Sequence, residues 1–272
     1  MLRRGAVAAC ALLAVLLGGT LVAFLVWRES APTIVTLTTT PERLAHPTMH
    51  GFLEALLDLP CADRVQLNVP WTYHRTGKAY VIPEAVRALA RTRHLVLHRC
   101  EDEGPATKML GALRDPRIPE SAFLVALDDD QLYRPDVVCR LKDAARKLGT
   151  EGKVFSMCEE EVMGFRGFAG TKQTLRAVLR HGQPAACLSF DDFWWQWALR
   201  RENISCVAVP YEADSSDWDC SIRDAETRRQ APRGTWGELQ FLPDIHERGN
   251  RCLESLKRQS DLAPPEAGRL FL

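Results

Sequence analysis

The stretch Phe123-Leu124-Val125-Ala126-Leu127-Asp128-Asp129-Asp130 joins five apolar residues to three consecutive carboxylates. A short apolar run of this kind predicts a β-strand that is buried on both faces. Open α/β sheets bind their ligands at the carboxyl ends of the strands, which is where these acids fall. Adjacent carboxylates repel each other unless a cation lies between them, and their oxygens suit hard ions such as Mg²⁺ or Mn²⁺. The stretch therefore predicts either a metal site or a solvated acidic turn that caps the next helix.

Short β-branched or apolar runs alternate with helical patterns on both sides of this stretch. Strands are predicted at 33–38, 65–69, 94–98, 122–127, 153–157 and 206–210, and helices at 49–57, 83–91, 106–113, 135–148, 171–179 and 193–201. The βαβα order of the first half predicts a mainly parallel, three-layer α/β/α sheet with right-handed crossovers. Glycines at 164, 167 and 170 predict a close-approach loop or a bulged strand. The chain is polar and turn-rich from residue 211, with a weak tail from 237 to 272.

The charge balance and the N-terminus restrict the class of protein. Lys+Arg and Asp+Glu both number 35, and this balance argues against a nucleic-acid-binding protein. Residues 5–27 carry no charge and are long enough to cross a hydrocarbon core of about 30 Å. We therefore expect a cytoplasmic tail at 1–4, a transmembrane signal anchor at 5–27, a short stem at 28–32 and a luminal domain at 33–272. A cleaved signal peptide is the alternative.

The cysteines are compatible with an oxidising lumen. Eight of them follow the predicted anchor, and eight cysteines allow 105 full pairings. No CxxC pair occurs, which argues against a zinc ribbon or finger. The alternative interpretation is that several of the eight are free, buried, small apolar residues. The sequence Asn203-Ile204-Ser205 is an acceptor site for N-glycosylation if this side is luminal.

Four polar segments carry the candidate site. They are Thr38-Thr39-Thr40-Pro41-Glu42-Arg43, Gly104-Pro105-Ala106-Thr107-Lys108, the acidic triplet, and Asp191-Asp192. The first segment and the triplet follow strands, so they are expected at the same edge of a parallel sheet. The second segment begins a helix, and the sequence does not decide at which edge of the sheet it lies. Its amide groups and the point charge of Lys108 suit a phosphate. Together the segments indicate a phosphate-bearing ligand bridged by a metal.

In this order, these segments resemble those of glycosyltransferases of the GT-A fold, in the family-2-like group. The resemblance covers about residues 33–210 and implies a Rossmann-like, nucleotide-sugar-binding α/β/α fold. It implies Mn²⁺ or Mg²⁺ as cofactor, a nucleotide-sugar donor, and a glycan, glycoprotein or lipid-linked acceptor. It also implies a single-pass type II protein of the Golgi or another endomembrane lumen.

The resemblance implies a role for each matching residue. Asp128 and Asp130 match the Asp-x-Asp motif, which holds the metal and the donor ribose, and Asp129 is an alternative member of the pair. Asp192, or else Asp191, matches the general base of inverting members. The positions matched to the donor nucleotide are Thr38, Thr39, Arg43, Thr107 and Lys108. His246 matches a C-terminal histidine that is a metal ligand in some members.

The chemistry of transfer requires these residue types. A divalent cation absorbs the charge that develops on the departing diphosphate. A carboxylate within hydrogen-bond reach removes the proton of the attacking hydroxyl. A single displacement would invert the configuration of the anomeric carbon. The sequence alone does not exclude a reaction that retains it.

Structural interpretations stand beside the functional ones. Asp191-Asp192 fits an N-cap pair, and Lys108 fits a solvated helix lysine. Trp194, Trp195 and Trp197 fit the core, although one or two of them fit a platform for an acceptor sugar. Two other functions are open. One is a membrane-anchored sugar-binding domain without turnover. The other is a haloacid-dehalogenase-type phosphatase, whose motif Leu132 does not match.

Overall fold

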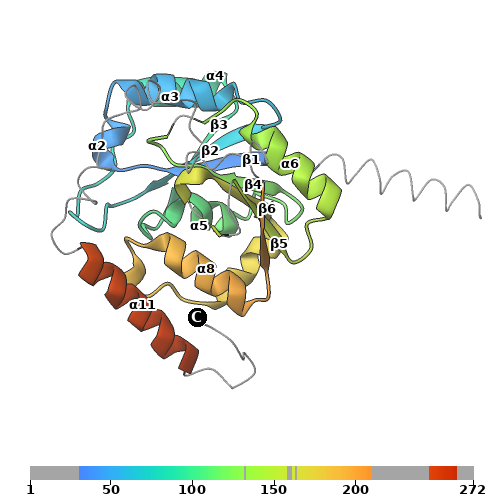
Figure 1. Cartoon of the computed structure of the whole chain (residues 1–272). Coiled ribbons are helices and arrows are strands. Elements are labelled where there is room, and N and C mark those ends of the chain that lie inside the picture. Colours follow the sequence, from blue (N-terminus) through green and yellow to red (C-terminus); the bar gives the residue numbers. More distant parts are fainter. Residues whose placement is uncertain (1–30, 132, 158–160, 163, 210–244, 262–272) are drawn as a thin grey trace, which may run out of the picture. The chain divides into compact units, whose positions relative to one another are not determined.

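The computed structural model describes residues 31–261 except 132, 158–160, 163 and 210–244. These residues form one seven-stranded sheet in the order β3-β2-β1-β4-β6-β5-β7 (Figure 1). The strands are β1 (Thr33–Thr38), β2 (Arg64–Pro70), β3 (Leu95–Cys100), β4 (Phe123–Ala126), β5 (Lys153–Ser156), β6 (Phe168–Thr171) and β7 (Ser205–Ala208). The apolar run that precedes the acidic triplet is thus a strand next to β1, with all four of its residues buried.

The predicted parallel sheet is confirmed for all strands but one. β1 pairs in parallel with β2 and with β4, β2 with β3, and β5 with β7. β6 is antiparallel to both β4 and β5, so it alone runs the other way. The glycine-bearing segment between β5 and β6 is too short for the helical crossover that a parallel pair requires. A one-turn 3₁₀ helix, η1 (Gly164–Arg166), lies in it, as expected for a close-approach loop before a strand.

Helices cover both faces of the sheet, which confirms the three-layer architecture (Figure 1). One core contains Val35 and Leu37 of β1 with the inner sides of α3, α4 and α6. The other contains Ile34 of β1 with α5 and α8. Alternate residues of one strand therefore enter different cores, as the pleat requires. The helices of the first half are α2 (Pro41–Leu44), α3 (Thr48–Leu57), α4 (Glu84–Thr92), α5 (Thr107–Arg114) and α6 (Val137–Leu148).

The second half contains α7 (Lys172–Leu175), two short 3₁₀ helices, η2 (Arg176–Arg180) and η3 (Ala185–Cys187), then α8 (Asp191–Arg201) and α11 (Ile245–Asp261). The expectation of a weak tail is wrong for 245–261, because α11 is a 17-residue helix. Its residues Cys252 and Leu256 lie in the same core as the tryptophans of α8. Much of the rest of α11 is polar, and this polarity hid the helix in the sequence.

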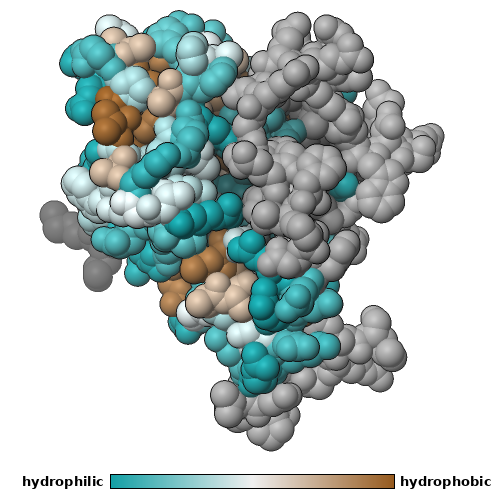
Figure 2. Space-filling model, turned by 90° about the vertical axis from the view of Figure 1, so that its left-hand side faces the viewer, coloured by the Kyte–Doolittle hydropathy of each residue, from teal (hydrophilic) through white to brown (hydrophobic). Residues whose placement is uncertain are grey.

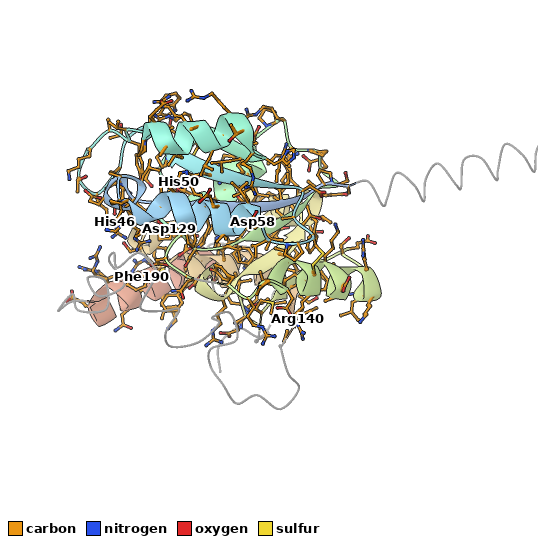
Figure 3. All side chains as sticks on the ribbon, turned by 90° about the horizontal axis from the view of Figure 1, so that it is seen from above. His46, His50, Asp58, Asp129, Arg140 and Phe190 are labelled. Atoms are coloured by element: carbon orange, nitrogen blue, oxygen red, sulfur yellow. A yellow bond between two sulfur atoms is a disulfide. The ribbon has the colours of Figure 1, made fainter. Side chains whose placement is uncertain are left out.

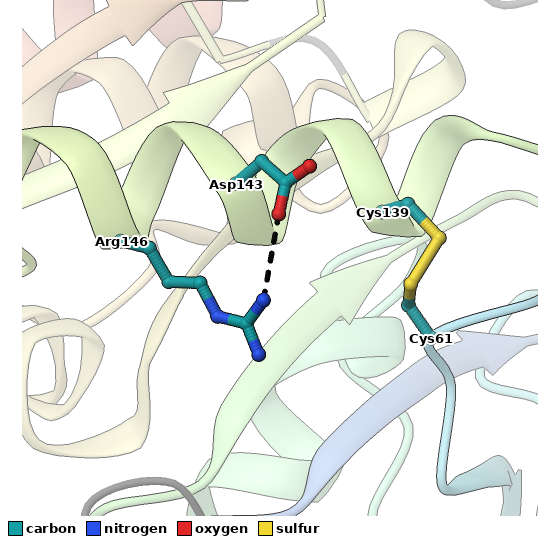
Figure 4. The surroundings of a disulfide bond; sticks show 4 residues. All are labelled: Cys61, Cys139, Asp143 and Arg146. Carbon is teal, nitrogen blue, oxygen red and sulfur yellow. Dashed lines mark ion pairs between the residues drawn. A yellow bond between two sulfur atoms is a disulfide. The ribbon is translucent and has the colours of Figure 1, made fainter.

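Two disulfides join distant parts of the described chain. Cys61, in the turn before β2, pairs with Cys139 in the first turn of α6 (Figure 4). Cys187 of η3 pairs with Cys252 of α11. These bonds confirm that at least four cysteines are oxidised in this fold.

Among the described helices, none is both long and apolar enough to cross a membrane. The predicted anchor at 5–27 lies outside the described residues.

Candidate functional site

The acidic triplet follows β4 and lies at the carboxyl edge of the parallel strands. Asp128 is the most accessible of the three, with a side chain 22% exposed against 6% for Asp129 and Asp130. Its Oδ1 accepts a 2.8 Å hydrogen bond from Nζ of Lys108, and its backbone N–H donates to Oη of Tyr133 at 2.8 Å. The interpretation as a solvated acidic turn is therefore wrong, because two of the three carboxylates are buried.

Arg43 of α2 holds the two buried carboxylates. Its guanidinium pairs with Asp129 and, at 3.0 Å, with Oδ2 of Asp130. Thr39 donates a 2.6 Å hydrogen bond to the other oxygen of Asp129. Burial raises the pKa of Asp129, although Arg43 and Thr39 act in the opposite direction. Thr39 and Arg43 thus hold the acidic triplet in this structure, and their predicted contact with the donor nucleotide stays a prediction.

Lys108 lies between the two acidic segments. Its Nζ is 2.8 Å from Oδ1 of Asp128 and 3.2 Å from Oδ2 of Asp191, and its side chain is 4% exposed. Burial alone would lower the pKa of Lys108, but the nearby carboxylates of Asp128, Asp191 and Asp192 outweigh it and raise the pKa. The lysine is therefore charged and is not the solvated helix lysine of the alternative interpretation.

The turn before Lys108 lies at the same edge as the triplet. The sequence had left this placement open. Helix α5 follows β3, and β3 is parallel to β2 and β1, so α5 begins where those strands end. Lys108, in the first turn of α5, can therefore reach Asp128 at the end of β4.

Asp191 and Asp192 form the first turn of α8. The residue that precedes the helix is Phe190, so neither aspartate is the N-cap residue, although both acids lie in the first turn, where acids are favoured. Oδ1 of Asp192 accepts a 2.8 Å hydrogen bond from the backbone N–H of Gly164. Burial, and next the charge of Asp191, raise the pKa of Asp192 to about 7. Burial also raises the pKa of Asp191, which Lys108 opposes.

Two other residues predicted to contact the donor nucleotide, Thr38 and Thr107, bind backbone groups in this structure. Oγ1 of Thr38 donates to the backbone oxygen of Asn68 at 2.9 Å. Oγ1 of Thr107 accepts from the backbone N–H of Glu103 at 2.8 Å. Both hydroxyls thus support local backbone. His246 falls within α11, but its side chain is not among those that the structure describes, so its metal-binding role stays a prediction.

The tryptophans of α8 are core residues. Trp194, Trp195 and Trp197 are 1%, 0% and 6% exposed, which confirms the core interpretation and leaves no sugar platform among them. Phe193 is the exposed large hydrophobic side chain of this helix. Its ring is stacked on that of Phe190 with 5.9 Å between centroids. Figure 2 shows that hydrophobic surface occurs in separate areas among hydrophilic residues on the face it presents.

Sequence reasoning missed two contributors to the site. Gly164 supplies an amide to Asp192 and lies against Lys108. Its place in a glycine-rich segment was the available signal. Tyr80 donates from Oη to the backbone oxygen of Thr39 at 2.9 Å, and no motif pointed to it. In Figure 3, Asp129 and Phe190 lie toward the same end of the molecule, and Arg140 lies away from them.

The groups that the site offers to a metal ion are carboxylates. The described residues contain no group of three His, Cys, Asp or Glu that could hold a metal ion. Mg²⁺, however, is often bound by only one or two carboxylates together with substrate phosphates. Among the acids of the site, Asp128 pairs with Lys108 and Asp130 pairs with Arg43. Asp128 and Asp130 are the two carboxylates that would hold such an ion.

No family model matches the sequence, and no curated protein matches it. Solved structures do match. A cytidylyltransferase from Leptospira borgpetersenii is 14% identical, with a TM-score of 0.51, over 88% of this chain and 99% of that one. Glucosyl-3-phosphoglycerate synthase from M. tuberculosis is 13% identical, with a TM-score of 0.42, over 74% of this chain and 76% of that one. CMP:2-keto-3-deoxy-manno-octonic acid synthetase complexed with CTP is 13% identical, with a TM-score of 0.46, over 66% and 89%.

At these identities the likeness shows the fold alone. The chain has a Rossmann-like fold with a mixed seven-stranded sheet. Its carboxyl edge carries a buried acidic site in which Lys108 and Arg43 pair with the carboxylates. Such an edge is where open α/β sheets bind ligands.

Proposed function

We propose that this protein is a metal-dependent glycosyltransferase that moves a sugar from a nucleoside-diphosphate sugar to an acceptor hydroxyl. The observation that carries the proposal is the position of Lys108 between Asp128 and Asp191. Three segments that are far apart in the sequence thereby form one site. They supply a point charge for phosphate, a carboxylate for the cation, and a second acid pair for proton transfer.

The charges of the site favour a cation as part of the donor complex. A diphosphate and the carboxylate of Asp128 are both negatively charged, so a divalent cation between them would offset their repulsion. A bound Mn²⁺ or Mg²⁺ would stabilise the developing charge of the leaving diphosphate. Asp128 and Asp130 are the residues proposed to hold it. Lys108 is proposed to turn from Asp128 toward the donor phosphates when the donor binds.

Asp192 is the proposed general base. Asp191 is engaged with Lys108, whereas Asp192 is held through one oxygen by the N–H of Gly164. A pKa of about 7 suits proton transfer near neutral pH, because a base works best when its pKa lies near the operating pH. Attack by the deprotonated hydroxyl on the anomeric carbon in one displacement would invert the configuration. The hydroxyl proton passes to Asp192, and the nucleoside diphosphate leaves.

The cellular setting is proposed on separate grounds. Disulfides persist in oxidising compartments, and Cys61–Cys139 and Cys187–Cys252 support an extracytoplasmic or luminal domain. The uncharged run at 5–27 supports a type II anchor, and the Golgi or another endomembrane is the proposed location. Asn203 is exposed in the turn after α8, where a glycan could be attached. The acceptor is proposed to be a glycan, glycoprotein or lipid-linked sugar.

The decisive experiment assays the purified full-length chain against a panel of nucleotide sugars, with Mn²⁺, with Mg²⁺ and with EDTA. We expect release of nucleoside diphosphate that requires the metal and is lost in Asp128→Asn and Asp192→Asn. Asp143→Asn is the control, because Asp143 is exposed on α6 and pairs there with Arg146 at 3.6 Å (Figure 4).

Other outcomes identify other functions. Binding of a nucleotide sugar without turnover would indicate a sugar-binding domain. Release of pyrophosphate from a nucleoside triphosphate and a sugar phosphate would indicate nucleotidyl transfer, the activity for which the Leptospira protein is named. Release of inorganic phosphate from a phosphate ester would indicate a phosphatase. Any of the three would overturn the glycosyltransferase proposal.

A further inference from the structure

A stripe of polar side chains lies on the face of the sheet that α5 covers. Thr36 of β1 is opposite Gln66 of β2, and Asn68 of β2 is opposite His98 of β3. The first three side chains are fully buried. A sheet face packed under a helix is normally apolar, and a buried polar group is costly unless it is hydrogen-bonded. The buried side chains of the stripe are therefore expected to have hydrogen-bond partners.

Two members of the stripe bind the backbone of the site lysine. Asn68 donates from Nδ2 to the carbonyl oxygen of Lys108 at 2.9 Å and to Oγ1 of Thr36 at 2.8 Å. Thr36 donates from its hydroxyl to the same carbonyl oxygen of Lys108. Oδ1 of Asn68 accepts from Nε2 of Gln66 at 3.1 Å. The hydrogen-bonding groups of the asparagine are thus occupied, and two side-chain donors hold one carbonyl of α5.

The helix is packed directly on these groups. A Cβ atom on Gly111 would lie 2.5 Å from Oδ1 of Asn68, so a larger residue at that position would push α5 off the sheet. Glycine in a helix interior costs up to about 1 kcal/mol relative to alanine, so its presence here is explained by this close approach.

We propose that Thr36 and Asn68 are positioning residues, which fix the first turn of α5 so that the Lys108 ammonium stands between Asp128 and Asp191. The carbonyl that they bind and the ammonium belong to one residue, whose side chain leaves the helix at that turn. The consequence for catalysis rests on the proposed function, whereas the positioning of Lys108 does not.

The test measures the lysine itself. ¹⁵N labelling of lysine detects ammonium groups that are buried and paired, and among the described lysines Lys108 and Lys172 are buried. The Lys108 signal is assigned by its loss in Lys108→Met. Lys172, which donates to the carbonyl oxygens of Asp115 and Ile118, is the internal reference. Thr36→Val removes one donor to Lys108 together with one acceptor of Asn68, and it keeps the side-chain shape.

The matched control is Thr33→Val. Thr33 is also fully buried in β1, and its hydroxyl has no hydrogen-bond partner within the described chain. We expect Thr36→Val to shift or broaden the Lys108 signal while the Lys172 signal persists, and we expect Thr36→Ser to restore it. Thr33→Val should leave the Lys108 signal in place. If Thr36→Val does not fold, Thr36→Ala removes the same donor, with Thr33→Ala as its control.

Turnover provides a second, separable readout. In an active enzyme, misplacement of Lys108 in Thr36→Val should lower kcat by about tenfold or more, since small displacements of a catalytic group have large effects on rate. Thr33→Val should retain kcat. An unchanged Lys108 signal in the folded Thr36→Val protein overturns the positioning proposal even if the enzyme is active. A shifted signal in a chain that turns over no nucleotide sugar supports positioning and contradicts only the proposed function.

Discussion

Gly164 lies so close to Lys108 that a Cβ atom on its backbone would stand 2.1 Å from the lysine Nζ and 3.4 Å from Oδ1 of Asp192. Real Cβ atoms do not approach other atoms at the first of these distances, so a side chain at 164 forces a shift. The end of a lysine side chain can move, but the movement would take the ammonium away from Asp128 and Asp191. The geometry of the site therefore depends on the absence of a side chain at this position.

Gly164→Ala should accordingly impair the site more than the fold. We expect a folded protein whose kcat is lower by about 100-fold, because the displaced ammonium no longer stands at the acid pair. Gly51→Ala is the control, since Gly51 lies within α3 and a Cβ there meets nothing within 4 Å. That variant should be active and slightly more stable, as expected for alanine in a helix. A fully active Gly164→Ala enzyme would show that Lys108 has no part in turnover.

The pH dependence of the rate should report Asp192. Its pKa is raised to about 7, first by burial and then by the charge of Asp191, and a general base must be deprotonated. The kcat should therefore fall as pH decreases below about 7 and level off above it. The measurement is kcat between pH 5 and 9 with saturating substrates. A rate that is flat through this range would exclude Asp192 as the base.

The stability of the protein should change with pH in the opposite sense. The folded pKa of Asp192 is raised above its ordinary value, so the folded state binds this proton more tightly than the unfolded state does. The contribution is present below the unfolded pKa and is lost as pH rises through about 7. Asp192→Asn should flatten this part of the stability profile, which urea denaturation at several pH values would measure. An unaltered profile in Asp192→Asn would assign the titration to another group.

The parts of the site that could be predicted from sequence are those with a local signature. The apolar run before Asp128 marks a buried strand, and strand order then places the triplet at the ligand-binding edge. Asp192 could be recognised as a candidate site residue because the acidic pair Asp191-Asp192 precedes a predicted helix. The placement of Lys108 was not decided by the sequence. It follows from the observed parallel pairing of β3, because the helix after a parallel strand begins at the edge where that strand ends.

Contacts between distant segments had no such signature. The sequence contains Arg43 and Asp129 without indicating that they pair across 86 positions. The reversed direction of β6 depends on the length of the loop before it, which hydrophobic pattern does not encode. The helix α11 escaped notice because the buried hydrophobic residues of its described part, Cys252 and Leu256, stand among many polar ones.

Arg43 should contribute to stability more than an exposed ion pair does. Its partners Asp129 and Asp130 are buried, so Arg43→Met would leave buried carboxylates without their cation. We expect a loss of about 3–5 kcal/mol in the free energy of unfolding, measured by urea denaturation at pH 7.5. The added substitution Asp129→Asn should recover part of this loss, because it removes the uncompensated charge. Equal free energies of unfolding for Arg43→Met and the parent chain would show that the ion pairs of Arg43 make no net contribution to stability.

The disulfide Cys187–Cys252 should matter for activity as well as for stability. It fastens α11 to η3, just before the helix that carries Asp191 and Asp192, and Nε1 of Trp197 donates to Oγ of Ser260 in α11 at 2.9 Å. Replacing both cysteines by alanine should cost about 4 kcal/mol of unfolding free energy, as expected for a closed loop of this length. It should also lower kcat, because α8 loses part of its support.

The matched control is the pair Cys61 and Cys139, which joins the turn before β2 to α6, where no residue of the proposed site lies. The sequence separations are 78 for this pair and 65 for Cys187–Cys252, so chain entropy predicts a similar loss of stability for both double alanine variants. Only the Cys187–Cys252 variant should lower kcat and change the near-UV circular dichroism of the tryptophans in α8. If both variants lose activity equally at a temperature where both are folded, α11 has no specific role in holding the acid pair.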